Sequence, residues 1–130
     1  MIEAVTTLIS GGHGFFMGAL GQKILLDRFW PDIPHVVMVE NNSYPDYKLD
    51  YLRRLGSEVR IVRAIRTRRA KFATKRWPRT FTKLNLWNLT DFEHVLFMDA
   101  DAYPYNTAVE QLYSLLEPDF LGATTFAKNT

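Results

Sequence analysis

The sequence predicts an α/β fold in which a mostly parallel sheet is flanked by helices. Short β-rich runs alternate along the chain with stretches of helical periodicity, and this alternation is typical of parallel strands joined by right-handed crossovers. The chain has 130 residues, of which 47% are hydrophobic and 14% aromatic, enough to bury one core. We therefore expect a single domain over residues 1–130.

The first half of the chain predicts three strands separated by two helices. Runs of apolar and β-branched residues place the strands at residues 4–9, 35–39 and 58–62. Helical periodicity places the helices at about residues 15–29 and 46–55. Gly11 and Gly12 form a turn after the first strand, Pro31 and Pro34 end the first helix, and Gly56 ends the second.

The second half begins with a basic segment of weak periodicity. Beyond it we expect a helix at about residues 80–89, a strand at 94–98, a helix near 109–116 and a fifth strand at 120–125. Residues 95–98 are all apolar, which favours a place in the middle of a sheet that is covered on both faces.

Two aspartates directly follow this apolar strand. Asp99 and Asp101 stand at i and i+2, so on extended backbone their carboxylates project to the same side and can share a hard divalent cation. The small Ala100 between them leaves room for a ligand. Ligands of open parallel sheets bind beyond the carboxyl ends of the strands, where the Gly11-Gly12 turn also falls. An Asp-x-Asp triplet alone is a weak signal, so its context decides.

The net charge of +2 conceals an asymmetric distribution. Residues 60–79 contain no acidic residue and nine basic ones: Arg60, Arg63, Arg66, Arg68, Arg69, Lys71, Lys75, Arg76 and Arg79. Such a segment can be a solvated face, a nucleic-acid patch or a loop that faces phosphate, and charge alone does not rank these uses.

Several classes of protein are disfavoured by what the sequence lacks. The chain has no cysteine, which excludes disulfides, thiolate metal sites and a cysteine nucleophile. Neither a Walker loop nor a Gly-x-Gly-x-x-Gly fingerprint is present. Glu3 stands where a signal peptide carries positive charge, and no apolar stretch reaches the ~18 residues of a membrane span. We expect a soluble, cytoplasmic protein without membrane contact.

Residues 81–101 closely resemble a segment of the family 8 glycosyltransferases, the group that contains glycogenin and galactinol synthase. The shared pattern is Thr-Lys-Leu at 82–84, Trp87, Leu89-Thr90, the apolar strand and Asp-Ala-Asp at 99–101. Residues 5–20 resemble the family's first strand and helix, and residues 109–112 resemble the helix that follows its metal motif. The resemblance implies a Rossmann-like GT-A fold, a UDP-sugar donor, Mn²⁺ or Mg²⁺, and transfer of a hexose with retention at the anomeric carbon.

The same resemblance implies roles for individual residues. Asp99 and Asp101 match the metal-binding pair, and the donor-binding positions are Ile9, Gly11, Gly12, Phe15, Arg76, Lys83, Asp99 and Ala100. Family members often carry Thr-Asn at the two glycines and tyrosine at Phe15. A phenyl ring can still stack on a base, whereas the side-chain hydrogen bonds of Thr-Asn are lost. Some of residues 66–79 are expected to attract the diphosphate, and we expect Leu84, Leu86 and Trp87 to pack in the core.

The family's third metal ligand, a histidine, and its acceptor-binding half follow the segment that this chain matches. His13, His35 and His94 do not match that histidine motif, and only His13 falls on a loop at the correct edge of the sheet. The resemblance therefore implies the nucleotide-binding part of a glycosyltransferase with the C-terminal acceptor half absent. A homo-oligomer or a partner chain could supply that half, and the acceptor is not identified.

Two alternatives remain open. A sugar-nucleotide nucleotidyltransferase also binds metal through carboxylates, but it normally has an arginine in its glycine-rich loop, and no basic residue lies near Gly11-Gly12. A non-enzymatic nucleic-acid or partner-binding module could be built on residues 60–79, and steeply salt-dependent binding without a response to manganese would favour it. We rank both below the UDP-sugar enzyme.

Overall fold

The chain folds around a four-stranded parallel sheet. The computed structural model describes residues 2–66, 81–106, 108 and 111. The strands are β1 (Ala4–Ile9), β2 (His35–Glu40), β3 (Glu58–Val62) and β4 (Val95–Phe97), in the spatial order β3-β2-β1-β4. All three strand pairs are parallel. The predicted α/β fold with a Rossmann-like parallel sheet is confirmed.

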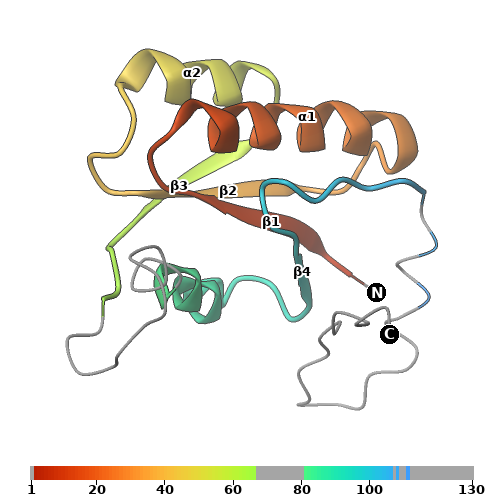
Figure 1. The fold of residues 1–130 in the computed structure, drawn as a ribbon. Coiled ribbons are helices and arrows are strands. Elements are labelled where there is room, and N and C mark those ends of the chain that lie inside the picture. The colour runs from red at the N-terminus through yellow and green to blue at the C-terminus, as the bar shows by residue number, and fades with distance from the viewer. Residues whose placement is uncertain (1, 67–80, 107, 109–110, 112–130) are drawn as a thin grey trace, which may run out of the picture.

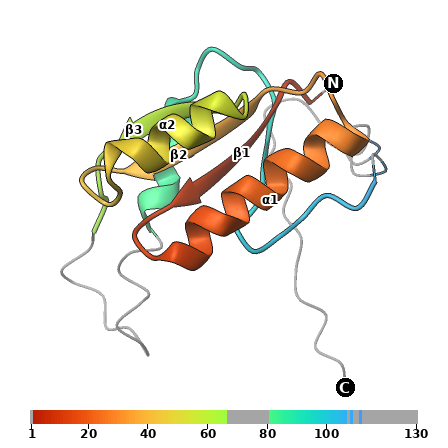
Figure 2. The same cartoon turned by 90° about the horizontal axis from the view of Figure 1, so that it is seen from above.

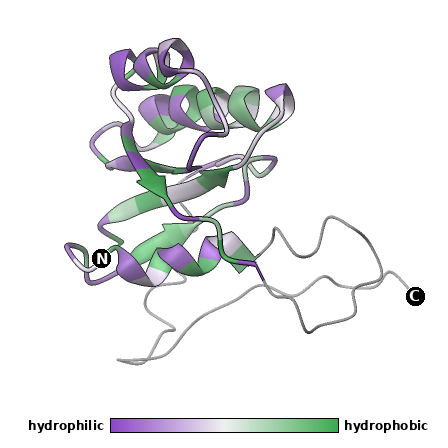
Figure 3. Ribbon diagram, turned by 90° about the vertical axis from the view of Figure 1, so that its left-hand side faces the viewer, coloured by the Kyte–Doolittle hydropathy of each residue, from purple (hydrophilic) through white to green (hydrophobic). Residues whose placement is uncertain are grey.

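The sheet is covered on both faces (Figure 1). Helices α1 (His13–Phe29) and α2 (Asp46–Arg54) lie on one face, and the 3-10 helix η1 (Phe81–Asn88) lies on the other. Seen from above, α1 and α2 lie side by side along the strands (Figure 2). Coloured by hydropathy, the strands between these layers are largely apolar (Figure 3). Parallel strands need this double cover because both of their faces are apolar.

Residues on opposite faces of β1 contribute to separate parts of the core. Ile9 packs with Phe16 and Ala19 of α1, whereas Ala4 packs with Leu89 beyond η1. All three of these partners and both strand residues are buried. The alternation follows from the two-residue period of a strand, and it fixes which side chains can reach the helix face.

Strand β4 occupies an edge of the sheet within the part of the chain that the structure describes, which corrects the expected central position. Its ladder with β1 is three residues long, from Ala4↔Val95 to Thr6↔Phe97, and its side chains are only half-buried. The middle strands are β1 and β2, whose residues are almost all buried. The helix predicted near 109–116 and the strand predicted at 120–125 lie outside the described residues.

The segment predicted as a helix at 80–89 is the 3-10 helix η1. Its three-residue period aligns Thr82 with Asn85, and both are buried and bonded to backbone: Thr82 Oγ1 accepts from Ile65 N at 3.2 Å, and Asn85 Nδ2 donates to Arg63 O at 2.8 Å. The same period places Leu84 and Trp87 on another face, where they are 44% and 60% exposed. The expected core packing of Leu84 and Trp87 is therefore wrong. Leu86 does pack in the core, against the buried cluster of Ala4, Val36, Met38 and Leu89.

None of the helices that the structure describes is both long enough and apolar enough to cross a bilayer.

Candidate functional site

The strand order creates a switch point between β1 and β4. The chain leaves β1 through α1 and returns as β2, which pairs with one edge of β1. Strand β4 pairs with the other edge of β1. The segments that leave β1 and β4 begin at the same edge of the sheet, and a crevice lies beyond the carboxyl ends of these two strands. Ligands of open α/β sheets bind in such crevices.

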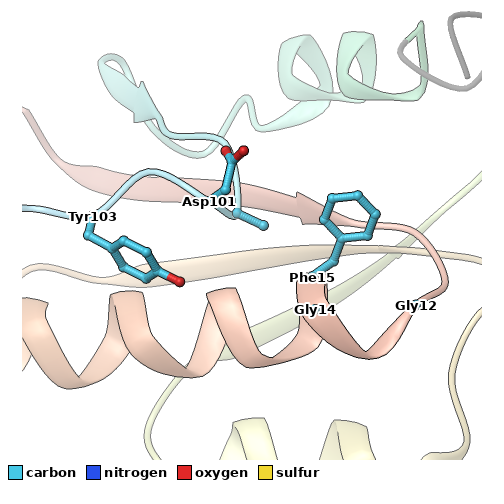
Figure 4. Close-up of a pocket in the computed structure, with 6 residues that line it drawn as sticks. Gly12, Gly14, Phe15, Asp101 and Tyr103 are labelled. Carbon is cyan, nitrogen blue, oxygen red and sulfur yellow. The ribbon is translucent and has the colours of Figure 1, made fainter.

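A cavity of about 380 Å³ occupies this crevice (Figure 4). It is lined by Gly12, Gly14 and Phe15 after β1 and by Ala100, Asp101 and Tyr103 after β4. The glycine turn and the aspartate turn were expected to meet at this edge, and Gly12 and Asp101 do so.

Two aromatic rings flank the carboxylate in this cavity. In Figure 4 the Phe15 ring rises from the first turn of α1, and the Asp101 carboxylate between Phe15 and Tyr103 points away from the helix. Phe15 is 47% exposed and Tyr103 is 49% exposed. Large aromatic side chains that remain open to solvent beside a charged group offer stacking surfaces to a planar ligand.

The glycine turn opens the first turn of α1 toward the cavity. Gly11 and Gly12 have φ values of 63° and 91°, in the left-handed region that favours glycine. Gly12 caps α1 without a side-chain hydrogen bond, and the first turn carries no acidic residue. The unpaired N–H groups and the positive end of the helix dipole are thus directed at the side of the cavity where an anion could bind.

Tyr44, in the loop between β2 and α2, holds the glycine turn in place. Its hydroxyl donates to the carbonyl oxygen of Gly12 at 2.9 Å, and its ring packs against Phe16 at 6.2 Å between centroids. Burial raises the pKa of Tyr44 to about 12, so the phenol remains a hydrogen-bond donor into the alkaline range.

The aspartate turn lies directly against α1. Ala102 N donates to Asp99 O at 2.8 Å, which closes the turn, and the buried Gln22 of α1 donates to both Asp99 O and Ala102 O. A Cβ built on Gly18 would meet Ala100 O at 2.0 Å, so helix and turn are in backbone contact.

The donor set of this turn fits a hard divalent cation in part. Asp99 and Asp101 lie in a turn closed by Ala102 N and Asp99 O, which corrects the expected extended backbone, and of the two only Asp101 lines the cavity. Both residues are exposed, and they supply the carboxylate oxygens that Mn²⁺ and Mg²⁺ prefer. Among the described residues no cluster of three His, Asp or Glu side chains surrounds a common point. The remaining ligands of an octahedral ion would have to come from phosphate oxygens and water. His13 begins α1 beside Phe16 and does not line the cavity.

Of the other predicted donor residues that the structure describes, none lines this cavity. Ile9 is fully buried in the core, and Gly11 precedes the lining residues. Lys83 is exposed on η1, on the opposite face of the sheet from α1, and does not line the cavity. Arg76 lies outside the described residues. The sequence reasoning missed Gly14 and Tyr103, although Tyr103 continues the i, i+2 spacing of Asp99 and Asp101.

Two arginines in the described part of the basic segment, Arg60 and Arg66, form ion pairs. Arg60 pairs with Glu58 and with Asp91, at 2.6 Å to the latter, and its hydrogen bonds lower the pKa of Asp91. Arg66 donates to the buried carboxylate of Glu40 at 2.6 Å, and Ser10 donates to the same carboxylate. Glu40 ends β2 and Ser10 follows β1, so Arg66 lies at the sheet edge that carries the cavity.

Fold and cavity together define an α/β protein with a Rossmann-like parallel sheet and a ligand crevice at its switch point. No protein-family model matches the chain. Over 100 residues it is 29% identical to UDP-glucuronate:xylan alpha-glucuronosyltransferase 1 of Arabidopsis thaliana. The aligned stretch is 76% of this chain but 15% of that protein. The chain is therefore similar to a small part of a glycosyltransferase, and the likeness does not single out glycogenin.

Proposed function

We propose that this chain is the donor-binding part of a metal-dependent glycosyltransferase that transfers a hexose from a UDP-sugar with retention. The cavity at the switch point carries the proposal, because it joins an acidic turn, two stacking surfaces and an open helix N-terminus in a space of about 380 Å³. The plant relative is named for a UDP-glucuronate donor, which makes a UDP-hexose or its uronic acid the first donor to test.

The base and the diphosphate of a nucleoside diphosphate sugar each have a suitable neighbour at this cavity. The exposed ring of Phe15 can stack on the base, since every base has a π-face. The first-turn N–H groups of α1 favour an anion such as the diphosphate. Lys83 and the basic residues of 68–79 add positive charge elsewhere in the sequence, which favours the approach of an anionic donor.

Asp99 and Asp101 would hold the cation. When bound there, Mn²⁺ or Mg²⁺ would neutralise the charge that develops on the diphosphate leaving group as the sugar bond breaks. Asp101 lines the cavity and Asp99 is exposed on the same turn, so both carboxylates can be reached from solvent without rearrangement of the core. The acceptor site would be supplied by further sequence, a second copy or a partner chain.

Calorimetric titration tests this proposal. UDP, UDP-glucuronate and UDP-glucose are titrated into the protein with and without Mn²⁺, and we expect saturable binding that is at least ~10-fold tighter with the metal. Asp101→Asn should abolish the gain that Mn²⁺ provides. Asp32→Asn is the matched control, because it removes the same charge from an exposed turn before β2, at the opposite edge of the sheet.

Two results would contradict the proposal. Equal UDP binding with and without Mn²⁺ would exclude the metal-bridged donor site. Salt-dependent binding of single-stranded RNA or DNA, with no UDP binding, would instead favour the nucleic-acid module that the basic segment suggested.

A further inference from the structure

Gln22 stands out as a buried polar side chain in the middle of α1. It is 0% exposed, although glutamine is mostly a surface residue. Its Nε2 donates to Asp99 O at 2.6 Å and to Ala102 O at 2.9 Å, the two backbone carbonyls that bracket the aspartate turn. A buried amide whose hydrogen bonds are satisfied fixes its partners in one arrangement.

The other end of the Gln22 amide is fixed by a second buried polar group. Gln22 Oε1 lies 3.2 Å from His35 Nε2, and His35 Nδ1 lies 2.7 Å from Ser57 Oγ. His35 is 1% exposed and Ser57 is 4% exposed. This hydrogen-bond network thus connects the aspartate turn to Gln22 in α1, then to His35 at the start of β2, and finally to Ser57, which precedes β3.

The two backbone carbonyls determine the direction of every hydrogen bond in this network of Gln22, His35 and Ser57. Carbonyl oxygens only accept, so the NH₂ of Gln22 must face Asp99 O and Ala102 O, and its Oε1 must face His35. His35 therefore carries its proton on Nε2 and accepts from the Ser57 hydroxyl at Nδ1. Burial, aided by the charge of Lys23, lowers the pKa of His35 to about 4, so the ring is neutral at pH 7.

We propose that Gln22 is a positioning residue for the cation site: through two hydrogen bonds from the core it holds the turn that presents Asp99 and Asp101. The backbone contact between Gly18 and Ala100 sets how closely the turn approaches α1, and Gln22 sets its conformation. Within the described residues neither carboxylate forms a hydrogen bond to the core that could do this, and Asp99 and Asp101 are both exposed. The role at the cation rests on the proposed function, whereas the hold on the turn does not.

Gln22→Met tests both parts. Methionine keeps the length and the apolar stem but leaves Ala102 O without the donor from residue 22. Amide hydrogen exchange of residues 98–103, measured by mass spectrometry without ligand, should be at least ~10-fold faster than in the wild type. In calorimetry, the gain in UDP affinity that Mn²⁺ provides should fall ~10-fold, which is the lower end of the effect of groups that orient metal ligands. UDP affinity without metal should not change.

Ser57→Ala is the matched control, because it removes the far end of the same network and leaves the bonds of Gln22 to the turn in place. We expect a lower melting temperature with wild-type exchange at 98–103. If Gln22→Met does not fold, Gln22→Asn replaces it, since an amide shorter by one methylene cannot reach both carbonyls.

The outcomes separate the two proposals. Wild-type exchange at 98–103 in the Gln22 variant, or equal acceleration in Ser57→Ala, would overturn the hold on the turn. Faster exchange with an unchanged Mn²⁺ gain would overturn the positioning role. A wild type that shows no Mn²⁺ gain would refute the proposed function, and the exchange measurement would still decide whether Gln22 holds the turn.

Discussion

Gly18 of α1 and Ala100 of the aspartate turn are in backbone contact beside the cavity. A Cβ at position 18 would lie 2.0 Å from the carbonyl oxygen of Ala100 and 2.8 Å from its carbonyl carbon. Because these are backbone atoms, no rotamer change can relieve the overlap. Only glycine lets the helix and the turn approach so closely, and the cavity is built on this approach.

Gly18→Ala should therefore force α1 and the aspartate turn apart. We expect a loss of about 1–3 kcal/mol in the free energy of unfolding, the usual cost of overpacking, measured by urea denaturation. Gly14→Ala is the control in the same helix: nothing lies within 4 Å of its added Cβ, and the lower backbone entropy of the unfolded chain should stabilise the protein by about 0.5–1 kcal/mol. Equal stability of the two variants would contradict the close contact.

Phe15→Leu should weaken UDP binding with little effect on stability. Phe15 is 47% exposed, so few core contacts are lost, but the flat surface for the base disappears. Stacking of one base on one ring contributes about 1–3 kcal/mol, which corresponds to at least ~5-fold in the dissociation constant. Phe15→Tyr should retain wild-type affinity in the same calorimetric titration. Loss of binding in both variants would argue against stacking.

His35 should make the protein less stable in acid. Its pKa is lowered to about 4 in the folded chain, from 6.5 in the unfolded chain, so between these values the unfolded state binds more protons. The stability is complete above about pH 6.5 and declines as the pH falls to 4, by about 3 kcal/mol in total.

Urea denaturation between pH 4 and pH 7 measures this slope. His35→Gln removes the titrating ring while its amide can still bridge Gln22 and Ser57, and it should show the shallower dependence on pH. Parallel curves for the wild type and this variant would contradict the assignment to His35.

Tyr44→Phe should loosen the glycine turn. It removes the hydroxyl that donates to Gly12 O and preserves the ring contact with Phe16. The loss of one such hydrogen bond costs about 1 kcal/mol in the free energy of unfolding. Tyr47→Phe on α2 is the comparison, since Tyr47 is 71% exposed and its change should cost less than about 0.5 kcal/mol. If Tyr44→Phe lowered the free energy of unfolding by as little as Tyr47→Phe does, the hydrogen bond from Tyr44 to Gly12 O would contribute nothing to stability.

Most of the fold followed from the sequence because its strands are runs of apolar and β-branched residues and because glycines and prolines mark where the strands and helices end. Strands β1, β2 and β3 match the expected ranges to within one residue, and α2 ends one residue before the expected limit. The 3-10 conformation of η1 was not predictable from periodicity, since it depends on the buried Thr82 and Asn85 bonding to the distant residues Ile65 and Arg63. The edge position of β4 likewise depends on which strands pair, which no single segment encodes.

The candidate site was predictable only in part, for a related reason. Gly12, Phe15, Ala100 and Asp101 were expected at the carboxyl edge and do line the cavity. Lys83, which the family resemblance placed at the donor, lies on η1 across the sheet. Gln22 gave no signal, because a glutamine in an amphipathic helix looks like a surface residue until its tertiary partners are known.

The pairing of β1 with β4 also has a kinetic consequence. The residues that pair are about 90 positions apart in the chain, so this contact closes the longest loop in the described sheet and carries the largest entropic cost of closure. We expect the β1–β2–β3 unit to fold first and the β4 strand to dock last. Any ligand that bridges Phe15 and Asp101 would then slow the undocking of β4. Such a ligand would make β4 more resistant to proteolysis, and this protection would appear before any rise in the stability of the β1–β2–β3 unit.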